Sequence, residues 1–297
     1  MFCPHPPLRG TLSRRERDVA CTSHSGRNEE EGPEYMTRLL QGKVAVVTGA
    51  SKGVGKGVAE ALVEAGASVY ATGRTIDDAP LPPECVRIRC DHTDDTQVKA
   101  VFERISGEQA QLDILVNNVW GGYERMVDDG QFTWTLPFWQ QPIWRWDAMF
   151  VAGVRAHYVA GQFAASRMVQ QGWGLIVNIS FWAARKHIGN VAYGVAKAAT
   201  DKMTVDMASE LAKYNVAVVS LYPGLVRTEK VLAAAAYLDL TNSESPQFIG
   251  RTVAALATDP NIMEISGQIL IAAECARQYK FTDVDGKNPI PLRFEDV

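Results

Sequence analysis

The sequence predicts an α/β fold in which helices cover both faces of a doubly wound, seven-stranded parallel sheet. Short apolar runs alternate with helix-like segments from residue 44 to residue 279. Runs that are apolar throughout are typical of parallel strands buried on both faces. A glycine-rich turn joins the first run to the first helix, and regular alternation of strand and helix implies a parallel sheet.

Length and composition favour one large α/β domain over residues 36–297. The net charge of −4 gives no sign of nucleic-acid binding, and no apolar run reaches the ~18 residues of a membrane span. The five cysteines form no Cys-x-x-Cys pair and no even set. Free thiols in a reducing compartment are therefore expected, and with them a cytoplasmic location.

Residues 1–35 differ from the rest of the chain. They are rich in Pro, Ser and Arg, carry the acidic run 29–31, and show no periodicity. They also lack the apolar core of at least ~7 residues that a secretory signal needs. We expect a disordered leader, with Met36 as the natural first residue. Organelle targeting is the less favoured alternative, because acid and base are balanced in this segment.

The first predicted strand, 44–47, runs directly into a glycine-rich turn and then a helix. The turn reads Thr48-Gly49-Ala50-Ser51-Lys52-Gly53-Val54-Gly55. Glycines let the backbone approach a pyrophosphate, and a helix N-terminus offers free amides and a positive dipole end. The order strand, turn, helix therefore predicts a phosphate cradle.

The next predicted strand, 68–72, ends at Gly73-Arg74. An acid usually stands at this strand end when the cofactor has a free ribose 2′-hydroxyl. Here Arg74, together with Lys52 of the turn, suits a 2′-phosphate. The alternative is that both are solvated surface cations.

Two polar clusters follow the third and fourth predicted strands, 86–90 and 112–116. The first cluster, residues 91–95, contains Asp91 and His92 but no second ligand pair, so we reject a metal site. Asp91 is expected to cap the next helix, 97–105, or to touch an adenine. The second cluster is Asn117-Asn118, expected to bridge neighbouring strands or to contact a ribose.

Residues 123–145 form a long irregular insertion at the carboxyl end of a strand, where insertions often border the site. It carries Trp134, Phe138, Trp139 and Trp144. We interpret these rings as an aromatic wall for an apolar substrate. Core packing or a subunit contact is an equally weighted alternative. A single long helix is expected next, over 146–169.

The predicted strand 175–179 ends at Ser180, and a helix begins at about Val191. On that helix Tyr193 and Lys197 are four residues apart and share a face. A free tyrosine has a pKa of about 10. A neighbouring ammonium lowers that pKa, which makes the phenol usable for proton transfer. Ser180 is placed to hold a carbonyl or hydroxyl oxygen beside it.

The last part of the chain continues the alternation. Strands are expected at 216–221 and 268–272, and helices after Thr228 through Leu238, at 247–257 and at 274–279. Residues 283–286 match a calcium loop too briefly and are interpreted as a turn.

Taken together, the chain resembles the short-chain dehydrogenase/reductase family over roughly residues 40–272. The motifs that carry the resemblance agree in type, order and spacing: Thr48-Gly49-x-x-x-Gly53-x-Gly55, Asp91, Asn117-Asn118, Ser180, Tyr193-x-x-x-Lys197 and Pro223-Gly224. The resemblance implies a Rossmann fold, NAD(P)(H), and reversible oxidation of a small-molecule alcohol to a carbonyl. NADP(H) is the expected cofactor, with NAD(H) as the alternative.

The resemblance also implies residue roles. Tyr193 would be the general acid/base, Lys197 would lower its pKa and bind the nicotinamide ribose, and Ser180 would orient the substrate oxygen. The residues implied to line the cofactor are Gly49, Ser51, Lys52, Val54, Gly55, Arg74, Asp91, His92, Asn118, Tyr193, Lys197, Val226 and Thr228. The competing function is a non-catalytic NADP-binding scaffold on the same fold. The intact Ser-Tyr-Lys set favours an enzyme.

The sequence departs from the family pattern at several positions. Phe181 stands where a second serine is common, and Val119-Trp120 follow Asn118. No asparagine lies between Asn118 and Asn178, although many members hold a proton-relay water with one there. Because residues 272–275 replace the usual terminal glycine pair, a homodimer through the two long helices is expected rather than a tetramer.

Overall fold

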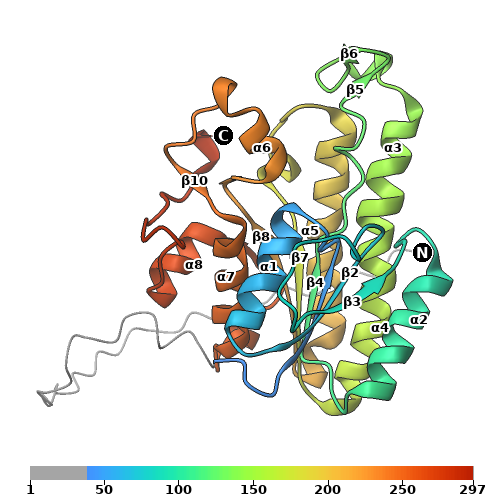
Figure 1. Cartoon of the computed structure of the whole chain (residues 1–297), viewed down its shortest axis with the longest axis vertical. Helices are drawn as coiled ribbons and strands as arrows, with labels where there is room; N and C mark the ends of the chain where they lie inside the picture. The colour runs from blue at the N-terminus through green and yellow to red at the C-terminus, as the bar shows by residue number, and fades with distance from the viewer. Residues whose placement is uncertain (1–38, 297) are drawn as a thin grey trace, which may run out of the picture. The chain divides into compact units, whose positions relative to one another are not determined.

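The computed structural model describes residues 39–296, and the predicted leader lies outside this range. The molecule is built on a seven-stranded sheet with the order β11-β8-β7-β4-β1-β2-β3, in which every neighbouring pair is parallel (Figure 1). Its strands are β1 (Val44–Thr48), β2 (Ser68–Gly73), β3 (Val86–Arg89), β4 (Ile114–Asn117), β7 (Gly174–Ile179), β8 (Val216–Tyr222) and β11 (Ile269–Ile271). The predicted doubly wound sheet is confirmed.

The order of the strands reverses between β1 and β4. The chain builds β1, β2 and β3 outward in one direction and then returns to the other side of β1. At such a switch point the connections from neighbouring strands run to opposite faces, which opens a crevice at their carboxyl ends. The glycine turn after β1 and the asparagine pair at the end of β4 lie at this point.

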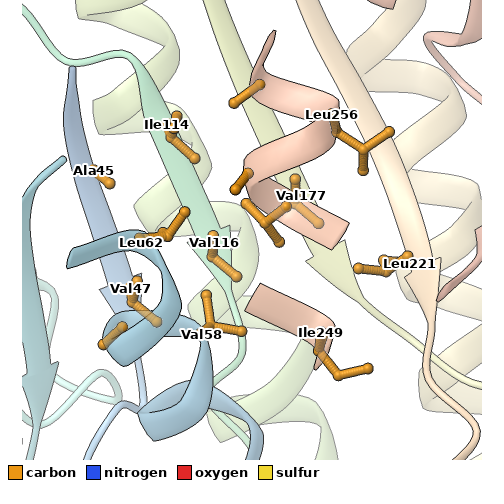
Figure 2. Packing of buried hydrophobic residues seen from close by; sticks show 14 of the residues in the cluster. Ala45, Val47, Val58, Leu62, Ile114, Val116, Val177, Leu221, Ile249 and Leu256 are labelled. Carbon is orange, nitrogen blue, oxygen red and sulfur yellow. The ribbon is translucent and has the colours of Figure 1, made fainter. Parts of the chain in front are cut away.

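Helices cover both faces of the sheet (Figure 1). One layer contains α1 (Gly53–Glu64), α7 (Pro246–Thr258) and α8 (Ala272–Tyr279), and the other contains α2 (Asp95–Glu108), α4 (Ala156–Gln171) and α5 (Val191–Leu211). Alternate strand residues enter the two cores: Ala45 and Val47 pack with α1 and α7, as Figure 2 shows, while Val44 and Val46 pack with the other layer. Burial on both faces explains why the central strands are largely apolar, whereas the edge strand β3 contains Arg87 and Arg89.

The expected single helix over 146–169 is wrong in detail. The chain forms α3 (Ile143–Met149), a π-helical turn over Phe150–Arg155, and then α4. Gly153 lies in the π turn, and a Cβ there would come within 2.7 Å of the Trp120 ring. The π turn thus places Gly153, which has no side chain, directly against the indole ring of Trp120. Turns of this kind are frequent at functional sites.

Two smaller groups of elements lie at one end of the sheet (Figure 1). The insertion forms the antiparallel hairpin β5 (Val127–Asp128) and β6 (Gln131–Phe132), and the segment after β8 forms β9 (Leu225–Val226), α6 (Glu229–Ala233) and β10 (Ser243–Glu244). The 3-10 turns are Phe138–Gln140, Trp182–Ala184, Ala212–Tyr214, Ala235–Tyr237, Ile262–Ile265 and Phe294–Asp296. The predicted helix through Leu238 is therefore shorter than expected.

Among residues 39–296, no helix has the length and apolarity to cross a membrane.

Candidate active site

The turn after β1 is a backbone cradle that depends on glycine at three of its positions, Gly49, Gly53 (φ +60°) and Gly55. Gly49 has φ +67°, in the left-handed region that favours glycine. At Gly55, a Cβ would lie 2.3 Å from Asn118 Nδ2 and 2.5 Å from the Gly49 oxygen. The missing side chains keep the first turn of α1 open toward the switch point. This geometry fits a pyrophosphate bound at the helix N-terminus.

The asparagine pair fixes this cradle from β4. Asn118 donates from Nδ2 to the backbone oxygens of Thr48 (3.1 Å) and Gly49 (3.0 Å). Asn117 donates to Asn178 Oδ1 of β7 at 2.9 Å. The bridging alternative therefore describes what both side chains do here, and a ribose contact from Asn118 stays a prediction.

The helix α5 begins at a side chain that also anchors the insertion. Asn190 is its N-cap and accepts the backbone N–H of Tyr193 at 2.9 Å through Oδ1. Its Nδ2 donates to the Trp134 backbone oxygen at 3.3 Å. One buried asparagine thus fixes both the start of α5 and an aromatic residue that packs on Tyr193.

Lys197 is fully enclosed one helical turn after Tyr193. Its Nζ donates to the Ile179 backbone oxygen at 3.2 Å and lies 4.2 Å from the centre of the Trp120 ring. Burial lowers the pKa of Lys197 to about 8, and the charge of Asp201 partly opposes this shift. The ammonium is held by one carbonyl and one aromatic face, a cation–π contact.

Tyr193 lies inside a box of aromatic rings. The ring centroids of Trp134, Trp120, Tyr123 and Phe181 are 5.4, 5.6, 5.9 and 6.3 Å from its own. Its side chain is buried, and its hydroxyl is 2.8 Å from that of Tyr123. The pKa of Tyr193 is raised, first by this burial and then by Tyr123. In this arrangement the pKa of Tyr193 is therefore raised and not lowered, because desolvation disfavours the phenolate, and a lowering by Lys197 stays a prediction.

The insertion contributes to this box through Trp134 alone of the four predicted wall residues. Phe138 and Trp139 are 65% and 71% exposed. The Trp144 ring lies under the guanidinium groups of Arg125 and Arg145, at 4.2 and 5.0 Å from their carbon atoms. Of the four aromatic residues of the insertion, Trp134 therefore lies at the site and Trp144 stacks with two arginines. The other two rings are on the surface.

Ser180 and Phe181 turn to different surroundings at the end of β7. Ser180 is buried, and its hydroxyl donates to the Lys197 backbone oxygen at 3.3 Å. The Phe181 ring stands beside Tyr193. The strand end therefore places the hydroxyl under α5 and the phenyl ring in the aromatic box.

At the end of β2, Arg74 forms an exposed ion pair with Glu124 of the insertion. Ser51 lies against the same strand end, because a Cβ on Gly73 would be 2.4 Å from its Oγ. Lys52 is the exposed N-cap residue of α1. Ser51 and Arg74 thus meet at one strand end, and no contact joins Lys52 to Arg74 among the described interactions.

The predicted helix cap at Asp91 is wrong. The N-cap of α2 is Asp94, whose Oδ1 accepts the backbone N–H of Thr96 at 2.9 Å. Asp91 instead accepts from the backbone and hydroxyl of Thr93, at 3.0 and 2.8 Å. The N-cap therefore lies three residues after Asp91, the first acid of the cluster. An adenine contact from Asp91 stays a prediction.

Two histidines lie buried near the cradle. A ring nitrogen of His92 is 2.7 Å from Thr72 Oγ1, and one of His157, on α4, is 3.0 Å from the Val119 oxygen. Burial lowers their pKa values, to about 4 for His92 and about 3 for His157. Across residues 39–296, no cluster of His, Cys, Asp and Glu could hold a metal ion.

These histidines predict acid sensitivity. Below about pH 6.5 these histidines are protonated in the unfolded chain but stay neutral in the folded chain. The free energy of unfolding therefore falls as the pH drops towards about 4. Each such group contributes about 1.4 kcal/mol per pH unit. We expect His92→Asn to reduce the loss between about pH 7 and about pH 5 by about 2 kcal/mol, as measured by urea denaturation. His187→Asn, on the surface, is the control, and an unchanged pH dependence in His92→Asn would contradict the prediction.

The segment after β8 closes the cradle from the opposite side. Val226 is buried in β9, and Thr228 is the N-cap of α6. A Cβ on Gly53 would lie 3.4 Å from Thr228 Cγ2, so this threonine contacts the glycine turn. The Gly53 backbone N–H donates to Glu229 Oε2 at 2.9 Å. A carboxylate therefore already binds an amide of the cradle.

Sequence reasoning missed three residues of this region. Tyr123 and Glu229 contact predicted site groups directly, and buried Glu244 accepts the Gly224 backbone N–H at 2.8 Å. Burial raises the pKa of Glu244 to about 7. None of the three lies within a recognisable local motif. The one local signal near Tyr123 is the preceding run Trp120-Gly121-Gly122, which departs from the family pattern after Asn118.

A glycine turn at the switch point of a doubly wound sheet is typical of dinucleotide-binding α/β folds. The chain belongs to the short chain dehydrogenase family, whose family model matches residues 43–236. It is therefore an oxidoreductase of the class that interconverts alcohols and carbonyls with NAD(P)(H).

The chain is also similar to individual known proteins of this family. The chain is 40% identical over 274 residues to the mouse protein Dehydrogenase/reductase SDR family member 1, covering 85% of this chain and 86% of that one. It is 27% identical over 249 residues to the 7alpha-hydroxysteroid dehydrogenase of Escherichia coli K12, covering 78% and 92%. A solved structure of a putative NAD(P) dependent gluconate 5-dehydrogenase from Beutenbergia cavernae, with bound NADP, matches with a TM-score of 0.65 and 26% identity over 78% of this chain and 96% of that one.

Proposed function

We propose that the protein is an NADP(H)-dependent carbonyl reductase or alcohol dehydrogenase in which Tyr193 is the general acid/base. The observation that carries the proposal is the enclosed pair on α5: a buried phenol one turn before a buried amine whose Nζ bonds to the Ile179 oxygen, at the carboxyl end of β7. A bound nicotinamide cofactor would supply or accept the hydride. Tyr193 would then give its proton to the substrate oxygen in reduction and take it back in oxidation.

The other residues divide the remaining tasks. Lys197, held by Ile179 and Trp120, would place its charge beside the phenol and stabilise it when the proton leaves. Ser180 would orient the substrate oxygen. The cradle, from Gly49 through Ser51, Lys52, Val54 and Gly55, would hold the pyrophosphate side. The further predicted contacts are Arg74, Asp91, His92, Asn118, Val226 and Thr228.

The aromatic box supports an apolar or ring-containing substrate. Planar rings surround the tyrosine hydroxyl, so a substrate that reaches it must lie against aromatic faces. The likeness to the bacterial 7alpha-hydroxysteroid dehydrogenase points the same way. The test is a panel of cyclic and linear carbonyl compounds with NADPH and with NADH, followed by absorbance. If no compound is turned over while NADPH binds, the non-catalytic scaffold function is favoured instead.

Cofactor preference gives a sharp prediction. Arg74 is free to exchange its exposed Glu124 partner for a 2′-phosphate, which accepts charge-assisted hydrogen bonds. Arg74→Asp is expected to move the preference toward NADH by about 2 kcal/mol or more, measured as the ratio of kcat/KM for the two cofactors. Arg104→Asp, on the far part of α2, is the control. Equal use of NADH and NADPH by the unmodified protein would contradict the preference.

Two further proposals concern assembly and location. Exposed apolar side chains follow the long helices, with Tyr158 on α4 and Val195 and Val205 on α5. A homodimer through these helices would cover them, and size-exclusion chromatography with light scattering tests it. The cytoplasmic location stays a prediction, supported by the free thiols of the described cysteines, Cys85, Cys90 and Cys275.

A further inference from the structure

Tyr123 brings a second phenolic hydroxyl to the reacting position. Its hydroxyl is 2.8 Å from that of Tyr193, although 70 residues separate the two in the chain. Among the interactions of the described residues, no other side-chain hydroxyl makes a hydrogen bond to Tyr193. The Ser180 hydroxyl is engaged with the Lys197 backbone oxygen at 3.3 Å.

The position of Tyr123 is fixed from three directions. Its ring centroid lies 5.4 Å from that of Trp134 and 5.9 Å from that of Trp120. Its backbone oxygen accepts Lys230 Nζ of α6 at 2.6 Å. The next residue, Glu124, pairs with Arg74. A hydroxyl held in this way is pre-organised, as a donor to a developing charge must be.

From this geometry we infer that Tyr123 is a further catalytic residue, a second hydroxyl donor to the substrate oxygen. The inference rests on the proposed function of Tyr193. A carbonyl oxygen that comes within hydrogen-bond reach of Tyr193 enters the space beside two hydroxyls that now bond to each other. It then accepts from both, so the bond between the two tyrosines is replaced by two bonds to the substrate.

In the reaction, Tyr123 would donate a hydrogen bond but would neither gain nor lose a proton. In reduction, a bound nicotinamide cofactor would supply a hydride to the carbonyl carbon, and the C=O π bond would break. The oxygen takes the electron pair of that bond and forms a new bond to the proton of Tyr193. Tyr123 keeps its own proton and stabilises the charge that develops on the oxygen and then on the Tyr193 phenolate. Solvent restores the Tyr193 proton.

Tyr123→Phe tests the role, because it removes the hydroxyl and keeps the ring against Trp120 and Trp134. We expect kcat for carbonyl reduction to fall about 10²-fold while NADPH affinity, measured by fluorescence, stays unchanged. The primary deuterium isotope effect with deuterated NADPH is expected to rise, since the hydride step is slowed selectively. Tyr237→Phe, at an exposed ring on the turn after α6, is the matched control and is expected to behave as the unmodified protein.

Two outcomes separate the inference from the function on which it rests. Unchanged or faster turnover in Tyr123→Phe, with Tyr193→Phe inactive, would overturn the inference alone and show that Tyr123 merely covers the phenol. Full activity in Tyr193→Phe would overturn the proposed function itself. A kcat that falls only in proportion to the loss of folded, NADPH-binding protein would also count against Tyr123, because the hydride step itself would then be unaffected.

Discussion

Replacement of Tyr193 with phenylalanine is expected to remove nearly all turnover, a loss of about 10²–10⁴-fold, while NADPH binding persists. The phenyl ring keeps the packing against Trp120, Trp134 and Phe181, so the aromatic box survives. What disappears is the transferable proton beside the substrate oxygen. Steady-state kinetics on one carbonyl substrate and a fluorescence titration with NADPH measure the two effects separately.

Tyr237→Phe provides the control for this variant, because that ring is 90% exposed on the short turn after α6. It is expected to keep full activity. More than about a tenth of normal turnover in Tyr193→Phe would exceed what the loss of general acid catalysis allows. The proton would then have to come from another group, and the assignment of Tyr193 would fall.

Gly55→Ala is expected to have the second-largest effect, on cofactor binding. The added methyl would stand 2.3 Å from Asn118 Nδ2 and 2.5 Å from the Gly49 oxygen. Either the asparagine must release the turn or the first turn of α1 must shift, and both distort the cradle. Overpacking of this kind costs about 1–3 kcal/mol. At the upper end the affinity for NADPH falls about 10²-fold, which isothermal titration calorimetry can measure.

The chain offers a matched glycine for comparison. Gly107 lies in the last turn of α2, and a Cβ there would meet nothing within 4 Å. Gly107→Ala is expected to leave NADPH affinity unchanged and to raise the free energy of unfolding slightly, by about 0.5–1 kcal/mol. Equal affinities in the two variants would show that the cradle tolerates a side chain at Gly55.

The sheet could be predicted from sequence because the information about it is local. Most strands of the sheet are runs of apolar residues, such as Val44–Thr48, and burial on both faces follows from such runs, whereas the edge strand Val86–Arg89 alternates with arginine. The glycine turn and the spacing of Tyr193 and Lys197 are equally local. The π turn over Phe150–Arg155 escaped prediction because its cause lies elsewhere in the chain, in the fit of Trp120 against Gly153.

The same distinction explains what was missed at the site. The contact between Gly53 and Glu229 spans 176 residues, and that between Tyr123 and Tyr193 spans 70. No periodicity or motif encodes such pairs, since they exist only after the sheet has brought its loops to one edge. The direction of the Tyr193 pKa shift could not be predicted from the sequence for a related reason. The sequence shows the lysine four residues away but not the rings that desolvate the phenol.

The carboxylates at the cradle bear on how cofactor affinity is to be understood. Glu229 binds the Gly53 amide and Glu124 binds Arg74, the groups proposed to receive the pyrophosphate and the 2′-phosphate. Binding would then exchange one anion for another at each group, so the number of hydrogen bonds and ion pairs at these two groups hardly changes. The measured affinity would be a difference between phosphate and carboxylate, and substitution of either glutamate would alter it as directly as substitution of a cofactor contact.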